Sequence, residues 1–295
     1  MFFLGFGAGL PLLLVLGTLS FRLREAGIER ATIGFLSWVG LAYAFKWAWA
    51  PLVDRVRLPF LYRWLGRRRS WLLLAQLATL IGLVGMAITD PQQGLGDLVA
   101  WAVLVAFGSA TQDIALDAYR IESASAQHQA ALAATYQSGY RLAMIWAGAG
   151  ALWLAAWAQT QHGYQHTAWQ LAYLVMALSM AVGAMTVLFS PEPAPLELPP
   201  TRGLREWLDS ALIEPFADFI RRNRWHAGLI LALIGTYRIS DVVMGIMANP
   251  FYVDMGYTKE QVAAVSKIFG VLMTLLGAFI GGVLSMRWGI MRILM

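Results

Sequence analysis

The sequence predicts an all-α membrane protein. Its 295 residues are 59% hydrophobic and only 13% charged, and the mean hydropathy is +0.59, whereas a soluble domain carries about 25% charged residues. Apolar stretches of roughly twenty residues, long enough to span a bilayer as helices, recur along the chain. We exclude a soluble protein because so few polar residues could not cover its surface.

Eight spanning segments are expected from these apolar stretches. They are residues 2–21, 32–52, 70–89, 98–120, 131–158, 167–189, 226–250 and 261–286. The first contains Gly5, Gly7, Gly9 and Pro11, so we expect it to be bent and closely packed. A signal peptide is not predicted, because no basic region precedes this span and no small-residue cleavage site follows it.

The spans divide the chain into three predicted domains. Residues 1–189 form a six-helix bundle, residues 190–224 a cytoplasmic linker with an amphipathic surface helix, and residues 225–295 a partial second bundle of two helices. This is the layout of the major facilitator superfamily, which is built from two six-helix halves. Because only two spans of the second half follow the linker, the sequence looks truncated after the eighth helix.

The basic residues predict the orientation of the chain. Fourteen Lys and Arg residues fall on one side of the predicted membrane and four on the other. By the positive-inside rule the side with fourteen is cytoplasmic, which places both chain ends in the cytoplasm. The net charge of +5 follows from this topology, so a nucleic-acid partner is not expected.

Asp113 and Asp117 are the leading functional candidates. They lie four residues apart in the fourth span and share one face of a helix. An ionised carboxylate at the bilayer centre costs roughly 2.5–3.5 kcal/mol, so the pair predicts a watery cavity, cationic partners or protonation. Lys46 and Arg141 lie at similar depths and can neutralise them. Since two neighbouring carboxylates repel, one should hold its proton more tightly, as proton-coupled transport requires.

Other interpretations of these charges stay open. The same four side chains can form a structural salt-bridge network between the second, fourth and fifth spans. Arg120 lies three residues from Asp117 and can pair with it locally, and in that case Asp113 is the better functional candidate. Arg238 and Asp241 likewise lie three residues apart and can pair within the seventh span.

The sequence gives no support to an enzyme, a cofactor or a metal site. It contains no cysteine, no His-Glu-x-x-His pattern and no Gly-x-Ser-x-Gly elbow. The four histidines fall in or beside connections, which makes them poor relay candidates. Gly94-Leu-Gly-Asp97 resembles a motif of intramembrane aspartyl proteases, but it lies in an outer connection rather than within a span.

Several motifs in the same order resemble the AmpG muropeptide permeases. They are Gly9-Leu-Pro11, Gly40-Leu-Ala-Tyr-Ala-Phe-Lys46, Trp49-Ala-Pro-Leu-Val-Asp-Arg55, Ser109-Ala-Thr-Gln-Asp-Ile-Ala-Leu-Asp-Ala118 and Gly139-Tyr-Arg-Leu142. The resemblance implies a monomeric, proton-coupled importer of anhydromuropeptides in the bacterial inner membrane. Its role would be peptidoglycan recycling, and its import would feed β-lactamase induction.

The resemblance also implies roles for individual residues. Proton coupling falls on the two aspartates, and substrate or charge-partner roles fall on Lys46, Gln112, Tyr140, Arg141, Arg238 and Asp241. For the arginines and the aspartate after the second span we expect a cytoplasmic gate, although topology signalling explains the arginines equally well. These gate residues are Asp54, Arg55, Arg67, Arg68 and Arg69.

Two other functions remain possible at this level. A transporter of another bulky anion, such as acetyl-CoA or a sugar phosphate, is one, because eukaryotic acetyl-CoA transporters share a related Gln-Asp-x-x-x-Asp block. A membrane receptor or scaffold that transports nothing is the other.

Overall fold

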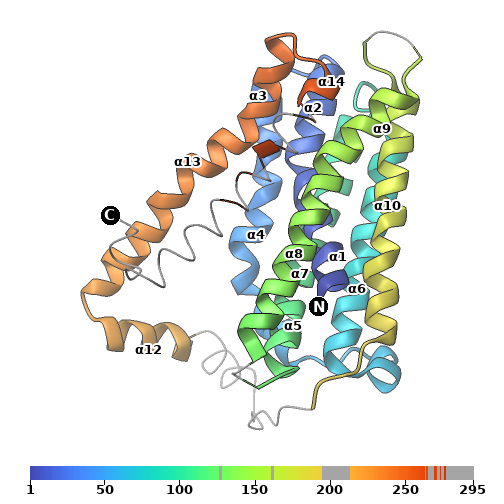
Figure 1. The fold of residues 1–295 in the computed structure, drawn as a ribbon. Helices are drawn as coiled ribbons and strands as arrows, with labels where there is room; N and C mark the ends of the chain where they lie inside the picture. Colours follow the sequence, from blue (N-terminus) through green and yellow to red (C-terminus); the bar gives the residue numbers. More distant parts are fainter. Residues whose placement is uncertain are drawn as a thin grey trace.

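The computed structural model describes residues 1–125, 128–160, 163–194 and 213–262, and the single residues 264, 269, 270, 273 and 276. Over these residues the protein is helical and contains no strand (Figure 1). Five of its helical segments are long and apolar enough to cross a membrane: Phe2–Glu25, Leu61–Ile88, Leu95–Glu122, Ala131–Ala158 and His166–Phe189. They confirm the all-α class and coincide with the predicted first, third, fourth, fifth and sixth spans.

The first span consists of α1 (Phe2–Val15) and α2 (Gly17–Glu25), which meet at Leu16, and its expected bend stays a prediction. It packs most closely on α8 (Gln129–Ile145). A Cβ atom on Gly9 would collide with the Tyr140 carbonyl oxygen, and one on Gly139 would collide with the Phe2 carbonyl oxygen. Glycine at these positions lets the two backbones touch, as small residues do at helix contacts in membranes.

The predicted second span is not one regular helix. Residues 30–55 form α3 (Arg30–Leu36), η1 (Ser37–Gly40), α4 (Leu41–Phe45), η2 (Lys46–Ala48) and α5 (Ala50–Arg55). Pro51 has no N–H with which to continue a helix, so the break before α5 follows from the sequence. These pieces pack along α7 (Leu95–Glu122). The tight 3₁₀ turn at the end of α4 positions Lys46 against α7.

The other spans complete one bundle around α1. α6 (Leu61–Ile88) packs on α7 and on α10 (His166–Phe189). The fifth span consists of α8, a π-helical turn η4 (Trp146–Gly150) and α9 (Ala151–Ala158). α7 carries Asp97 in its first turn and Arg120 in its last, and each charge complements the helix dipole at its end.

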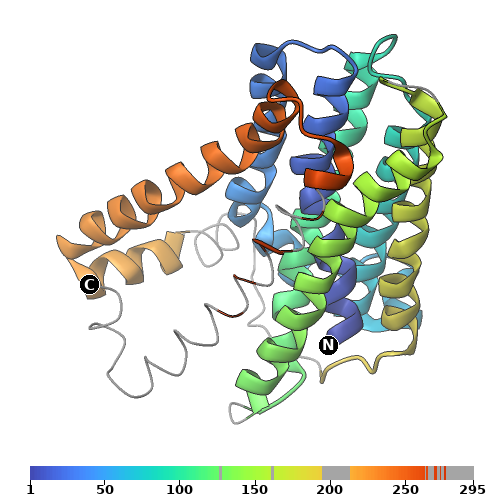
Figure 2. The same cartoon turned by 45° about the horizontal axis from the view of Figure 1, so that its top comes forward.

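The remaining described helices are α12 (Glu214–Asn223), α13 (His226–Asp254) and α14 (Lys259–Gln261). α13 corresponds to the predicted seventh span; it contacts α2 and α3, and it leans away from the bundle toward α12 (Figures 1 and 2). The predicted eighth span, 261–286, lies largely outside the described residues. The predicted surface helix of the linker, near Leu204–Leu212, lies wholly outside them. The proposed domain boundaries stay predictions.

Candidate functional site

Lys46 and Asp113 form an ion pair between the second and fourth predicted spans. The Lys46 Nζ atom lies 3.4 Å from Asp113 Oδ2, and the side chains are 36% and 20% exposed. The other carboxylate oxygen, Asp113 Oδ1, is buried and has no hydrogen-bond partner among the described residues. The carboxylate therefore has one oxygen bound to a cation and one free to take a proton or a ligand donor.

Three tyrosines lie near this ion pair. They are Tyr43, Tyr136 and Tyr140, all within reach of the charge of Asp113. The rings of Tyr136 and Tyr140 have centroids 5.9 Å apart. Sequence reasoning singled out Tyr140 and missed the other two. A signal was present, since Tyr43 lies three residues from Lys46 and Tyr136 lies four from Tyr140, which places each pair on one helix face.

Asp117 lies in a different environment from Asp113. Its side chain is 56% exposed, and its carboxylate lies 3.5 Å from the Arg120 guanidinium within the same helix. This is the local pair that the sequence left open. The geometry thus separates the two aspartates: Asp113 is enclosed and faces Lys46, whereas Asp117 is paired near the helix end.

Arg141 does not join the ion pair. Its guanidinium donates to Met144 Sδ at 3.7 Å, and it forms no ion pair within the described part of the chain. The reason is the rotation of α8: Gly139 faces α1, and Arg141 lies about 200° further around the helix. Of the two predicted cationic partners, the structure brings only Lys46 to Asp113.

Gln112 faces the interior of the bundle rather than the ion pair. Its side chain is fully buried, as is that of Gln76 on α6, and neither amide has a hydrogen-bond partner among the described residues. Both amides lie close to Gly7 of α1. The predicted substrate residues Arg238 and Asp241 lie on α13, and their side chains are outside the described part of the structure.

Most of the predicted gate residues gather at one end of the bundle, which we call the Glu122 end. The Arg68 guanidinium donates to Asp54 at 2.7 Å and makes two hydrogen bonds to Glu122, at 2.6 and 3.0 Å. Arg67 donates to the same carboxylate at 3.1 Å. Arg68 is buried, so these charge-assisted bonds join α5, α6 and α7 firmly. Sequence reasoning missed Glu122.

The start of the linker is tied to the same end. Glu192 accepts the backbone N–H groups of Arg68, at 2.8 Å, and Arg69, at 3.1 Å. These groups begin the spanning part of α6 after Gly66, whose positive φ of 81° interrupts the helix. A carboxylate at a helix N-terminus satisfies N–H groups that have no partner in the helix. Arg55 ends α5 beside this network.

A second charge cluster lies at the opposite end, where α13 meets the bundle. Asp254, the last residue of α13, accepts hydrogen bonds from Arg24 of α2 at 2.7 Å and from Arg30 of α3 at 2.6 Å. We call these three residues the Asp254 cluster. On the sequence, these two arginines are among the four basic residues on the non-cytoplasmic side of the predicted membrane, and Asp254 lies just outside the predicted seventh span.

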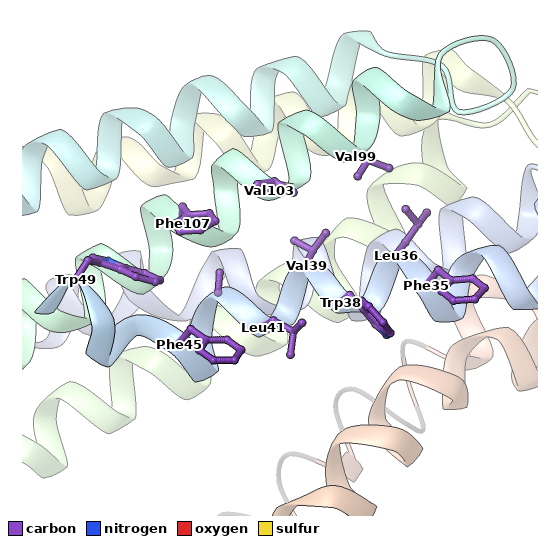
Figure 3. Close-up of a pocket in the computed structure, with 11 residues that line it drawn as sticks. Phe35, Leu36, Trp38, Val39, Leu41, Phe45, Trp49, Val99, Val103 and Phe107 are labelled. Carbon is purple, nitrogen blue, oxygen red and sulfur yellow. The ribbon is translucent and has the colours of Figure 1, made fainter. Parts of the chain in front are cut away.

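An apolar groove runs between the second span and α7 (Figure 3). Its volume is about 370 Å³, and its eleven described lining residues are all apolar, among them Phe35, Trp38, Phe45, Trp49 and Phe107. A polar ligand would leave its hydroxyl and carboxylate groups without partners there. The described lining therefore offers apolar contact rather than hydrogen-bond partners. Within the described ranges, no three His, Asp or Glu side chains gather as a metal site.

Comparisons with known proteins agree with this architecture. Residues 1–295 match the family described as the Major Facilitator Superfamily. The chain is 35% identical over 289 residues to the "Putative transporter AmpG 4" of Rickettsia felis, covering 98% of this chain and 67% of that protein. It is 38% identical over 294 residues to the "Anhydromuropeptide permease" of Escherichia coli K12, covering 99% of this chain and 56% of that protein.

A solved structure shares the fold. The chain resembles the crystal structure of a bacterial homologue of the human lysosomal transporter Spinster in an inward-facing and unoccupied conformation. The TM-score is 0.57 at 16% identity, and the match covers 97% of this chain and 60% of the other. This chain thus spans between about half and two thirds of the length of these relatives.

Proposed function

Because the chain belongs to the major facilitator superfamily and, within it, to the AmpG-type permeases, we propose that it acts in proton-coupled import of anhydromuropeptides across the bacterial inner membrane. The relative named an anhydromuropeptide permease supports the substrate. The single observation that carries the mechanism is the Lys46–Asp113 ion pair, in which one carboxylate oxygen is buried without a partner.

Asp113 is the proposed proton carrier. When it takes a proton, the ion pair with Lys46 loses its electrostatic attraction, and the Lys46 ammonium is released to bind an anion. A muropeptide supplies carboxylates on its peptide, so proton uptake and substrate binding favour each other at this site. Asp117 is the second candidate for proton coupling, and its exposed pair with Arg120 supports a lesser role.

The tyrosines beside the ion pair suit the sugar part of the substrate. Tyr136 and Tyr140 present aromatic faces and hydroxyl groups, which stack on sugar rings and hydrogen-bond to sugar hydroxyls. Arg141 on the same helix is a further proposed contact for the substrate. Gln112, which faces away from this site, contributes to packing of the bundle in this proposal.

Movement of the two halves gives access from alternate sides. Residues 1–189 form the first half and residues 225–295 belong to the second, joined by the linker 190–224. The network around Arg68 and Glu122 holds together the cytoplasmic end of the first half. Both chain ends lie on this cytoplasmic side. The Asp254 cluster joins the halves at the periplasmic end. Import delivers muropeptides to cytoplasmic recycling, and to β-lactamase induction where a regulator responds to them.

Uptake of labelled anhydromuropeptide tests this proposal. Escherichia coli cells that lack their own anhydromuropeptide permease and express this protein should accumulate the label above empty-vector cells. Accumulation should stop with a protonophore and with Asp113→Asn. Asp97→Asn is the matched control, because it removes an exposed carboxylate from the first turn of the same helix.

Three outcomes separate the parts of the proposal. No accumulation by correctly inserted wild-type protein refutes import by this chain. Accumulation that withstands the protonophore refutes proton coupling. If cells with Asp113→Asn accumulate as much label as cells with the wild-type protein, Asp113 is not the proton carrier. The proposed substrate is unaffected by that result.

A further inference from the structure

Residues 56–65, which connect α5 to the spanning part of α6, form an exposed aromatic surface. The Phe60 side chain is 85% exposed and that of Trp64 is 88% exposed, the highest values among the large apolar side chains of the described residues. Isolated exposed apolar residues are normal, but neighbouring ones in a single connection mark an interaction surface.

The same segment is basic. Arg57 and Arg63 are exposed, and no Asp or Glu occurs in residues 56–65. Neither arginine forms an ion pair with any described residue, in contrast to Arg67 and Arg68, which the Glu122 carboxylate engages. Arg57 lies over the Tyr62 ring at 5.0 Å, an arrangement that keeps its charge beside the aromatic surface.

The backbone conformation of Phe60 indicates that a molecule outside the protein contacts this segment. Phe60 has a positive φ of 67°, a conformation that is unfavourable for a bulky L-residue. Phe60 is also 85% exposed. In water the outward ring would gain nothing to offset the strain, whereas contact of the ring with hydrocarbon would offset it.

The position of the segment identifies that molecule. The segment ends at Gly66, where the non-helical backbone separates it from the spanning part of α6. The end of a spanning helix lies at the membrane surface, where aromatic side chains gather and arginines are attracted to anionic lipids.

We propose that residues 56–65 bind the anionic phospholipids of the adjoining leaflet. Arg57 and Arg63 contact lipid phosphates, while the rings of Phe60 and Trp64 enter the boundary between headgroups and acyl chains. Gly66 then acts as a joint: the segment stays on the membrane surface while the spanning part of α6 tilts with the Arg68–Glu122 network. This inference goes beyond the proposed transport function, and its test does not depend on transport.

Site-directed fluorescence tests this contact, because the chain contains no native cysteine. Phe60→Cys or Trp64→Cys is labelled with an environment-sensitive dye, and the whole protein is reconstituted in vesicles of phosphatidylcholine, with or without phosphatidylglycerol. Iodide on both sides reports exposure to water, and nitroxide-labelled lipids report membrane contact. Ser125→Cys, an exposed position between α7 and α8, is the control.

We expect phosphatidylglycerol to increase lipid quenching and to decrease iodide quenching at Phe60→Cys and Trp64→Cys but not at Ser125→Cys. Adding Arg57→Gln with Arg63→Gln should shift the equilibrium between lipid-bound and water-exposed segment about 30-fold toward water, because each basic residue contributes about fivefold near an anionic surface. Arg57→Lys with Arg63→Lys should keep the dependence on phosphatidylglycerol.

Three results would overturn the proposal. The first is iodide quenching at Phe60→Cys equal to that at Ser125→Cys in phosphatidylglycerol vesicles. The second is membrane contact that is the same with and without phosphatidylglycerol and is unchanged by the double Gln variant. The third is a label shielded from both quenchers, which would show that protein rather than lipid covers the segment.

Discussion

Breaking the Lys46–Asp113 ion pair is the most direct perturbation of the candidate site. At the observed 3.4 Å two unit charges attract by about 5 kcal/mol at an effective dielectric constant of about 20, and by about 1 kcal/mol in bulk water. The pair lies between these limits, because Lys46 is 36% and Asp113 is 20% exposed. Exposed pairs contribute up to about 1 kcal/mol, and breaking buried ones costs about 3–5 kcal/mol.

We therefore expect a coupling free energy of about 2 kcal/mol between the two side chains. Lys46→Gln and Asp113→Asn should each destabilise the protein, and the double variant should lose about 2 kcal/mol less than the sum of the two single variants. Reversible unfolding by dodecyl sulfate in mixed micelles measures this double-mutant cycle. Coupling below about 0.5 kcal/mol would refute our account of the pair.

The chain offers a matched control for this cycle. Asp218 and Arg222 on α12 form an ion pair at 2.8 Å, but their side chains are 57% and 76% exposed. Asp218→Asn with Arg222→Gln should therefore show a coupling free energy of about 0.3–0.5 kcal/mol, typical of exposed pairs on a helix. Equal coupling at both sites would mean that partial burial adds nothing to the Lys46–Asp113 pair.

The same variants separate substrate binding from proton coupling. Asp113→Asn resembles the protonated aspartate and leaves Lys46 without its carboxylate partner. It should keep muropeptide binding and lose proton-driven accumulation. Lys46→Gln should weaken binding roughly tenfold or more, since a hydrogen bond to a charged group contributes about 1.5–3 kcal/mol. Equilibrium binding and uptake assays on the same preparations test this split.

Three further predictions concern packing, the Glu122 end and the Asp254 cluster. Gly139→Val should abolish the folded bundle, because the valine side chain would collide with the Phe2 backbone. Gly34→Ala should have no such effect, because Gly34 has open space around it. Gel filtration in detergent compares the yields of the two variants. Glu122→Gln should lower stability by about 3 kcal/mol, because it leaves the buried Arg68 short of a carboxylate. Asp117→Asn at its exposed pair should lower stability by less than about 1 kcal/mol, and unfolding in mixed micelles compares the two. Hydrogen bonds from Arg30, and then from Arg24, hold the pKa of Asp254 below its ordinary value. The charged carboxylate of Asp254 therefore stabilises the contact between α2 and α13 fully above its ordinary pKa. This stabilisation is lost only as pH falls through the lowered pKa. Spin labels on α2 and α13 should thus keep one distance from pH 5 to 8, a range chosen above an ordinary Asp pKa of about 3.9, and Asp254→Asn should lengthen it at every pH.

Each of these has a clear contrary result. Equal yields of Gly139→Val and Gly34→Ala would mean that α1 and α8 do not meet as described. Equal destabilisation by Glu122→Gln and Asp117→Asn would remove the distinction between the buried network and the exposed pair. A distance between the spin labels that changes between pH 5 and 8 would mean that a group other than Asp254 controls the contact between α2 and α13.

Much of the fold could be predicted from the sequence because it depends on local properties. The length and hydropathy of an apolar stretch decide whether it can span a membrane, and five described helices coincide with predicted spans. The carboxylates in the fourth span were conspicuous for the same reason, since any charge in an apolar stretch is visible without knowledge of its neighbours. The break in the second span was less visible. Hydropathy does not report backbone continuity, although Pro51 carried a signal for it.

By itself, then, the sequence predicted five helices that the structure shows to be long and apolar enough to cross a membrane, that Asp113 needs a partner, and that Lys46 is a candidate for it. Only the tertiary structure decided that Asp113 rather than Asp117 is enclosed, that Arg141 faces elsewhere, and that Asp254 meets two arginines from the far end of the chain. Arg24 and Asp254 are 230 residues apart. Contacts of this kind depend on how helices rotate and pack against one another. The spacing of residues along a single helix does not predict that packing.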